Sequence, residues 1–123
     1  MEINEIKDIV QMYFDACFEG DGKKMSEVLN GAAHVYGRGP DGALNDMDKE
    51  TFVKLVGSVN PDKPRAEFPR QDEIISIDFT GENTAVARVK LRLGSTMFTD
   101  ILTFINLEGK WTIISKLYSG VTV

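Results

Sequence analysis

Hydrophobic residues recur at three- and four-residue intervals over the first half of the chain and at two-residue intervals over much of the second half. The longer interval is typical of a helix with one buried face, and it runs from Ile3 to Phe18, where Gly20 ends it. Asp21 and Asp48 stand where helix caps belong, each before a shorter segment with the same spacing. The pattern therefore predicts three helices.

Turn-forming residues separate short predicted strands from these helices. Residues 32–36 have the pattern of a strand, and the glycine-rich run 37–42 that follows cannot continue regular structure. A second short strand around residues 43–44 would complete a small hairpin. After the third predicted helix, residues 61–69 are predicted to form a loop that begins and ends with proline.

The two-residue interval predicts an antiparallel meander of four strands in the second half of the chain. Gly94 and Ser95 fit a two-residue hairpin turn with glycine first, which would place Val89 opposite Asp100. The predicted strands are residues 71–79, 84–93, 96–107 and 110–119. This register collects on one face Ala85, Ala87, Val89, Leu91, Phe98, Leu102 and Phe104, with Asp100 among them.

Helices that precede an antiparallel sheet indicate a segregated α+β fold, in which the three helices cover the apolar face of the sheet. A strongly curved sheet would then form a cone-shaped roll. No repeat, low-complexity tract or linker interrupts the pattern, so we expect residues 1–123 to form a single domain.

The charge balance limits the partners of the protein. With 14 basic and 19 acidic residues the net charge is −5, which argues against binding to nucleic acid or to anionic membranes. The amino terminus lacks the basic start and apolar run of a secretion signal, and no stretch approaches the roughly 20 apolar residues of a membrane helix. We therefore expect a cytoplasmic protein.

Metal and cofactor chemistry has little support in the composition. His34 and Cys17 are the only residues of their types, so the usual zinc sites and an internal disulfide cannot be built. The acidic residues lack the spacing of a calcium loop, and the glycines lack that of a phosphate-binding loop. Neither a metal nor a cofactor is predicted.

Asp100 is the most informative residue, because a carboxyl group on an apolar strand face is costly unless it is hydrogen-bonded, neutralised or used. Tyr13, on the inner stripe of the first predicted helix, is a plausible partner. The pair indicates either a structural hydrogen bond in the core or the polar part of a pocket.

Lys116 is a second possible partner of Asp100. A three-residue turn over 107–109 would place Lys116 opposite Asp100, whereas a two-residue turn over 108–109 would place Leu117 there and turn Lys116 away. We favour the first arrangement, because it gives a buried carboxylate an opposite charge. An ion-paired Asp100 would stay ionised.

Several motifs occur in the order and spacing of one superfamily. They are Tyr13-Phe14-Asp15, Gly20-Asp21-Gly22, Phe98-Thr99-Asp100 with Leu102, and Gly109-Lys110-Trp111-Thr112-Ile113-Ile114-Ser115-Lys116. Over nearly its whole length the chain resembles the nuclear transport factor 2-like proteins, and among them the small bacterial branch called putative lumazine-binding. The resemblance implies a cystatin-like cone in which three helices and a curved sheet enclose a pocket. It implies no specific function, because that of the branch is unassigned.

The same superfamily includes polyketide cyclases and ketosteroid isomerase, in which a tyrosine and a protonated aspartic acid hydrogen-bond an oxyanion while a second aspartate moves the proton. Tyr13 and Asp100 resemble the first two groups. The spacing from Asp21 puts the position of the base at Gly37, which has no side chain to accept a proton. His34, on the strand leading there, could serve instead, or could be a half-buried strand residue bonded to backbone or water.

Two functions follow from these residues. The first is noncatalytic binding of a small apolar or aromatic molecule in the cone. The second is an isomerase, dehydratase or cyclase, with His34 as base and Tyr13 and Asp100 as hydrogen-bond donors converging on one ligand atom. A third possibility is a dimerisation module whose cavity is packed shut. The predicted pocket-lining residues are Tyr13, Cys17, His34, Phe52, Val56, Phe98, Asp100, Leu102 and Lys116.

The opposite face of the predicted sheet carries a basic row, Arg88, Lys90 and Arg92. Its neighbours are too apolar for a fully solvated face. We therefore expect a homodimer that buries part of this face through an isologous contact. The neighbours are Thr99, Ile101, Thr103 and Ile105.

Overall fold

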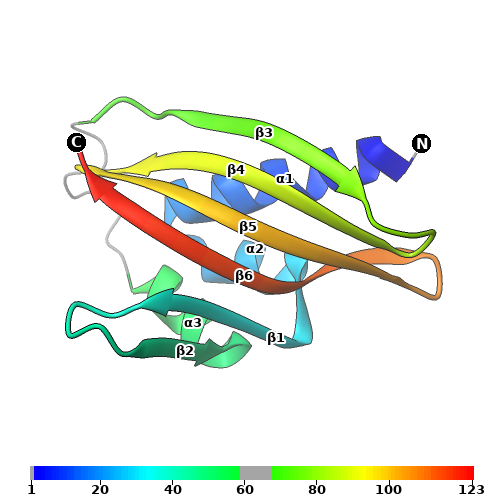
Figure 1. The fold of residues 1–123 in the computed structure, drawn as a ribbon, viewed down its shortest axis with the longest axis horizontal. Helices are drawn as coiled ribbons and strands as arrows, with labels where there is room; N and C mark the ends of the chain where they lie inside the picture. Colours follow the sequence, from blue (N-terminus) through cyan, green and yellow to red (C-terminus); the bar gives the residue numbers. More distant parts are fainter. Residues whose placement is uncertain (1, 59–67) are drawn as a thin grey trace.

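The structure is a computed structural model that describes residues 2–58 and 68–123. The loop predicted at 61–69 lies for the most part outside the described residues. The described residues form three helices and one six-stranded sheet, and the α+β class is confirmed (Figure 1).

The three helices begin where the sequence predicts. The Asp21 carboxylate accepts a hydrogen bond from the backbone N–H of Lys24 at 3.0 Å, and Asp48 accepts one from the N–H of Thr51 at 2.9 Å. Gly20 leaves the first helix in the left-handed region, with φ of +69°. The helices are α1 (Glu2–Glu19), α2 (Gly22–Val28) and α3 (Lys49–Gly57).

The four predicted strands form the expected meander, and a hairpin from the first half of the chain extends the sheet. The strand order is β2-β1-β6-β5-β4-β3. The sheet is mixed, because β1 pairs in parallel with β6 while the other pairs are antiparallel. The strands are β1 (Leu29–Arg38), β2 (Leu44–Asp48), β3 (Asp72–Phe79), β4 (Thr84–Leu93), β5 (Thr96–Leu107) and β6 (Lys110–Thr122).

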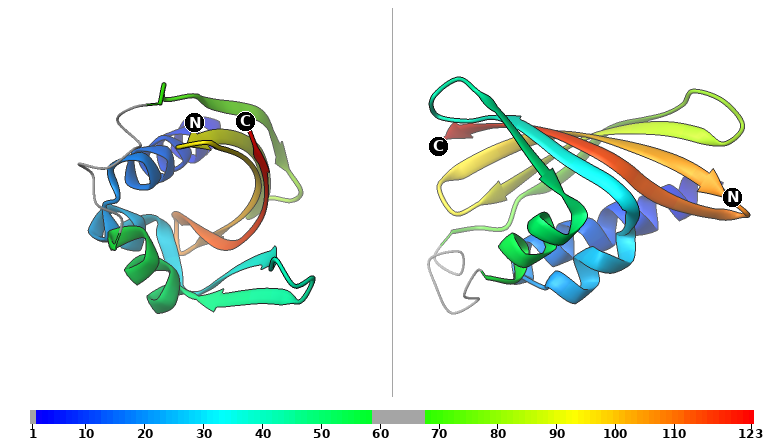
Figure 2. Two further views of the ribbon diagram at one scale, coloured as in Figure 1. Left: turned by 90° about the vertical axis from the view of Figure 1, so that its left-hand side faces the viewer. Right: turned by 90° about the horizontal axis from the view of Figure 1, so that it is seen from below.

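Curvature gives the molecule an inside and an outside. Figure 2 shows the sheet bent into an arc, with all three helices on its concave side. Helix α1 packs over β4 and β6, and α3 packs over β1 and β2. The core therefore lies between the helices and the concave face of the sheet.

The β4–β5 register is confirmed. Val89 pairs with Asp100, and Leu93 pairs with Thr96 across a turn in which Gly94 has φ of +62°. The predicted apolar positions of both strands point into the core; Phe98 is partly buried, and the others are buried together with Asp100. The period-two pattern was sufficient here because no bulge interrupts this pair of strands.

The β5–β6 register differs from the arrangement that we favoured. Leu107 pairs with Lys110 across a two-residue turn, in which Glu108 and Gly109 both have positive φ. The register then shifts by one residue at Ile114, so that Leu102, and not Asp100, pairs with Lys116. The two-residue turn alone would have turned Lys116 to the convex face, and this extra residue returns it to the concave face.

The convex face has an apolar centre with opposite charges at its two sides. Ile101 pairs with Leu117, which pairs with Tyr36, and the Leu117 side chain is 54% exposed. Arg88 continues this row on β4, and Asp46 ends it on β2. Among the described residues, no helix is long and apolar enough to cross a membrane.

Candidate functional site: a buried polar trio

The concave interior holds three polar side chains that come from three different elements. Tyr13 on α1 donates its hydroxyl hydrogen to Asp100 Oδ2 on β5. Lys116 on β6 places its ammonium nitrogen 3.8 Å from the same oxygen. Tyr13 and Asp100 have no exposed surface, and Lys116 is 8% exposed. Residues 87 positions apart are thus joined in the middle of the core.

Burial shifts the pKa values of two members of this trio, Asp100 and Tyr13. It raises the pKa of Asp100, while the charge of Lys116 and the Tyr13 hydrogen bond oppose that rise. The pKa of Tyr13 is raised well above its usual value, first by burial and then by the electrostatic effect of Asp100, with a smaller contribution from the neighbouring Cys17 side chain. Tyr13 therefore stays protonated, and Asp100 acts as the acceptor of their hydrogen bond.

The Lys116 ammonium group is surrounded by aromatic rings. Its nitrogen lies 4.5 Å from the centre of the Phe52 ring, 5.1 Å from that of Tyr13 and 5.6 Å from that of Tyr118. Aromatic faces attract a cation, and the attraction grows when water is excluded. These rings and Asp100 together stabilise a positive charge in the interior.

One oxygen of the trio has no partner. Asp100 Oδ1 is buried, and no side chain or backbone group of the described residues donates a hydrogen bond to it. Buried polar atoms are nearly always hydrogen-bonded, and an unsatisfied one costs about 1–3 kcal/mol, more if charged. The site therefore contains a strong acceptor that the described protein does not use.

The remaining predicted lining residues belong to the same core, with one exception. Cys17 lies one turn after Tyr13 on α1 and interacts with it. Phe98 is partly buried and contacts the Tyr118 ring edge-on, with ring centres 6.2 Å apart. The buried members of the set are Cys17, Phe52, Val56 and Leu102.

His34 is the exception, and the structure does not bring it to Tyr13 and Asp100. Its neighbours Ala33 and Val35 point into the core, so His34 lies on the other side of β1. Its Nδ1 atom is 2.7 Å from Asp46 Oδ1, and its ring stacks on Tyr36. The convergence that a His34 base would need is therefore absent.

Tyr118 is a site residue that sequence reasoning missed. It pairs with Asp100, and an ideal Cβ built on Gly37 would lie only 2.2 Å from its ring. Its hydroxyl oxygen accepts a hydrogen bond from Asn45 Nδ2 at 2.8 Å. The available signal was its place two residues after Lys116, on the same face of β6. The ring fills the place where a side chain at the base position would stand.

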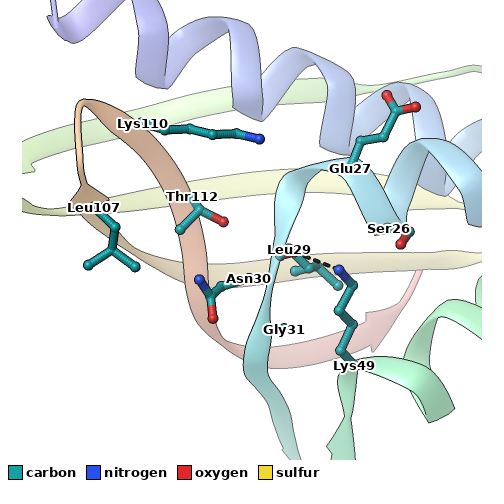
Figure 3. A pocket seen from close by; sticks show the side chains of 9 residues that line it. All are labelled: Ser26, Glu27, Leu29, Asn30, Gly31, Lys49, Leu107, Lys110 and Thr112. Carbon is teal, nitrogen blue, oxygen red and sulfur yellow. Dashed lines mark hydrogen bonds between the residues drawn. The ribbon is translucent and has the colours of Figure 1, made fainter.

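A surface groove of about 340 Å³ lies apart from this trio, between α2 and the β5–β6 hairpin (Figure 3). Lys49 crosses it and donates a hydrogen bond to the backbone oxygen of Leu29 at 2.9 Å. No residue of the polar trio lines it. Within residues 2–58 and 68–123, no group of three His, Cys, Asp or Glu side chains is placed to hold a metal ion.

Comparison with known proteins agrees with the fold. The architecture is that of the NTF2-like, or cystatin-like, proteins. The chain belongs to the family described as "Putative lumazine-binding", whose sequence profile matches residues 1–119. No curated protein shows significant similarity to it.

Solved structures show the same fold over almost the full chain. An NTF2-like protein of unknown function from Shewanella baltica has a TM-score of 0.88 at 24% identity, covering 99% of this chain and 95% of its own. Another, from Methylobacillus flagellatus, has a TM-score of 0.82 at 27% identity, with 98% and 93% covered. A ketosteroid isomerase-like protein from Erwinia carotovora has a TM-score of 0.74 at 15% identity, with 100% and 98% covered.

Proposed function

We propose that this protein binds a small, largely apolar molecule against Tyr13, Asp100 and Lys116 in the interior of the cone. The observation that carries the proposal is Asp100 Oδ1, a buried carboxylate oxygen without a hydrogen-bond partner among the described residues. A buried ion pair rarely stabilises a fold more than apolar residues of the same size. A bound molecule that donates a hydrogen bond to Asp100 Oδ1 would explain why the protein keeps this costly buried acceptor.

The surroundings of the trio favour a mainly apolar occupant. Phe52 lies against the Lys116 ammonium group, and Leu102 pairs with Lys116 across the sheet. Phe98 and Tyr118 add two partly buried rings beside them. Apolar walls with a few polar groups are typical of small-molecule sites, in which the polar groups set orientation and specificity.

Binding without turnover fits the geometry better than isomerase-like chemistry does. In that chemistry a protonated aspartic acid donates to an oxyanion, whereas Asp100 here accepts from Tyr13 beside an ammonium group. The position of the base is Gly37, covered by Tyr118, and His34 lies on the other side of its strand. The likeness to the ketosteroid isomerase-like protein from Erwinia carotovora is therefore a likeness of fold.

Thermal unfolding with a panel of probes tests the proposal. The panel is lumazine, progesterone and 1-naphthol, each added to the wild type, Tyr13→Phe and Asp100→Asn. His34→Gln is the matched control, because it changes a polar side chain on the opposite side of β1. We expect at least one probe to raise the Tm of the wild type and of the control by several degrees, but not that of the two site variants.

Two results would overturn the proposal. One is an equal rise of Tm in all four proteins, which would mean that the polar trio takes no part in binding. The other is no rise with any probe at millimolar concentration, which would mean that the interior accepts none of these ring systems.

We also propose that two copies of the chain pair through the convex face. Leu117 and Ile101 form its apolar centre, and Arg88 and Asp46 lie at opposite sides of it. A two-fold axis parallel to the strands would place β4 of one copy over β1 and β2 of the other. Basic and acidic sides then face each other, as an isologous contact requires.

A further inference from the structure

Asp100 Oδ1 restricts what a bound molecule can present to it. Tyr13 donates a hydrogen bond to Oδ2, and the Lys116 ammonium group lies close to the same oxygen. Oδ1 therefore has no hydrogen-bond partner among the described residues. In the ionised state of Asp100, which the neighbouring Lys116 ammonium group favours, Oδ1 can only accept hydrogen bonds. The complementary atom of the bound molecule is therefore an N–H or O–H donor.

Lys116 restricts the neighbouring atom of the same molecule. Its ammonium group has three N–H donors, and the 3.8 Å separation from Asp100 Oδ2 is longer than an ordinary hydrogen bond. The rings of Phe52, Tyr13 and Tyr118 attract its charge but offer no ordinary acceptor. A carbonyl oxygen of the bound molecule would satisfy it.

The net charge of the pair favours a neutral molecule. An anion drawn to Lys116 would be repelled by Asp100, and a cation drawn to Asp100 would be repelled by Lys116, both at short range and with little water to screen them. A neutral edge that carries a donor next to an acceptor avoids both repulsions.

We infer that the site takes a neutral, planar ring system with a lactam or cyclic imide edge, whose N–H donates to Asp100 Oδ1 and whose adjacent C=O accepts from Lys116. The inference rests on the proposed function and names the ligand class of that same site. Phe52, Phe98 and Tyr118 supply apolar surface for the rest of the ring.

Three bicyclic probes of matched size separate the two hydrogen bonds. 2-Quinolone has the lactam N–H and C=O, coumarin keeps the C=O but has a ring oxygen in place of the N–H, and naphthalene has neither. Their dissociation constants are measured by NMR chemical-shift titration. We expect 2-quinolone to bind at least about tenfold more tightly than coumarin, because coumarin leaves the buried carboxylate oxygen unpaired. Naphthalene should bind most weakly.

Two variants assign the hydrogen bonds to residues. Asp100→Asn should bring the 2-quinolone to coumarin ratio close to one, because the amide N–H₂ then replaces the acceptor. Lys116→Met should weaken both probes alike, because both lose the same carbonyl partner. Lys110→Met is the control, since this exposed lysine lies at the β5–β6 hairpin, and it should change neither constant. Circular dichroism and Tm show whether each variant is folded, and Tyr13→Phe provides a second way to perturb Asp100.

The outcomes distinguish the ligand class from the proposed function. Equal binding of 2-quinolone and coumarin to the wild type, with both weakened by Lys116→Met, would reject the lactam edge and leave a small-molecule site at the trio. If Asp100→Asn still bound 2-quinolone more tightly than coumarin by the same ratio, Asp100 would be rejected as the partner of the ligand N–H. Failure of every probe, together with failure of the broader panel, would reject the proposed function itself.

Discussion

The ring of Tyr118 lies directly on the backbone of Gly37. A β-carbon built on that glycine would be 2.2 Å from Cζ of the ring, and 2.5 Å from both Cε atoms. The two residues are neighbours across the parallel β1–β6 pair, and Asn45 on β2 holds the Tyr118 hydroxyl. Gly37 is thus required for close approach of an aromatic ring that also faces Asp100.

Gly37→Ala should destabilise the protein, because the ring must leave its place to admit a methyl group. Overpacking of this kind costs about 1–3 kcal/mol. Urea unfolding measures the change. Gly31→Ala on the same strand is the control, since no atom lies within 4 Å of its ideal Cβ, and it should have little effect.

A double variant checks the cause. Adding Tyr118→Ala removes the ring, so Gly37→Ala should cost less in that background than in the wild type. An equal cost in both backgrounds would mean that contact with the ring is not the reason for glycine.

The buried Asp100–Lys116 pair should make the protein no more stable than apolar residues at the same two positions would. Asp100→Val alone leaves the Lys116 ammonium unpaired and is expected to cost about 3–5 kcal/mol. Asp100→Val with Lys116→Met replaces the pair by apolar residues and should be as stable as the wild type, or more stable by up to about 4 kcal/mol, while binding no probe. The free energy of unfolding in urea decides between the two variants. A double variant as unstable as the single one would show that the pair is structural.

Acid should weaken the interactions by which Arg70 links α1 to the start of β3. Arg70 donates hydrogen bonds to Asp15 and, at 2.6 Å, to Asp72, and its guanidinium lies over the Phe18 ring. The Arg70 hydrogen bond lowers the pKa of Asp15. Because the pKa of Asp15 is lower in the folded state than in the unfolded state, its ionised carboxylate stabilises the fold at pH values above the unfolded pKa, near 3.9. This stabilisation is lost as the pH falls through the folded pKa.

Arg70→Gln should therefore be less stable than the wild type at pH 7, and the difference should shrink as the pH falls below about 4. Urea unfolding at pH 7, 4 and 3 measures it. Lys54→Gln is the control, because the Lys54–Glu50 pair is largely exposed and should contribute little at any pH. A difference that is constant over this range would contradict the role of Asp15.

Pairing through the convex face predicts a dimer that a charge at its centre abolishes. Leu117→Glu should shift the sedimentation equilibrium from dimer to monomer, because it buries an unpaired carboxylate. Leu55→Glu on α3 replaces a leucine of similar exposure, 51%, outside this face and should leave the dimer intact. A monomeric wild type, or equal behaviour of the two variants, would contradict the pairing.

Local rules explain most of what could be predicted from the sequence. The caps at Asp21 and Asp48 depend on side-chain oxygens close to the first turn of their own helices. The β4–β5 register depends on a short turn and uninterrupted alternation. Alternation in β5 also places Asp100 in the core, and the helical stripe of α1 places Tyr13 there. Each inference needed information from a few neighbouring residues only.

The parts of the candidate site that the sequence left open or missed depend on contacts between distant segments. His34 was expected to face the pocket, but the face of β1 is set by parallel pairing with β6, and no local signal marks that partner. Lys116 reaches Asp100 only because one residue, Ile114, is left unpaired in the β5–β6 ladder. The same unpaired residue turns the Tyr118 ring toward Gly37, so this contact could not be predicted from the sequence.

The sequence by itself determined the helices, the meander and the presence of a carboxyl group inside an apolar layer, because period and turn chemistry are encoded locally. The tertiary structure decided which side chains meet that carboxyl group. A bulge of one residue inverts the faces of a strand, and the packing of the whole sheet, rather than the composition of the strand, determines where it occurs.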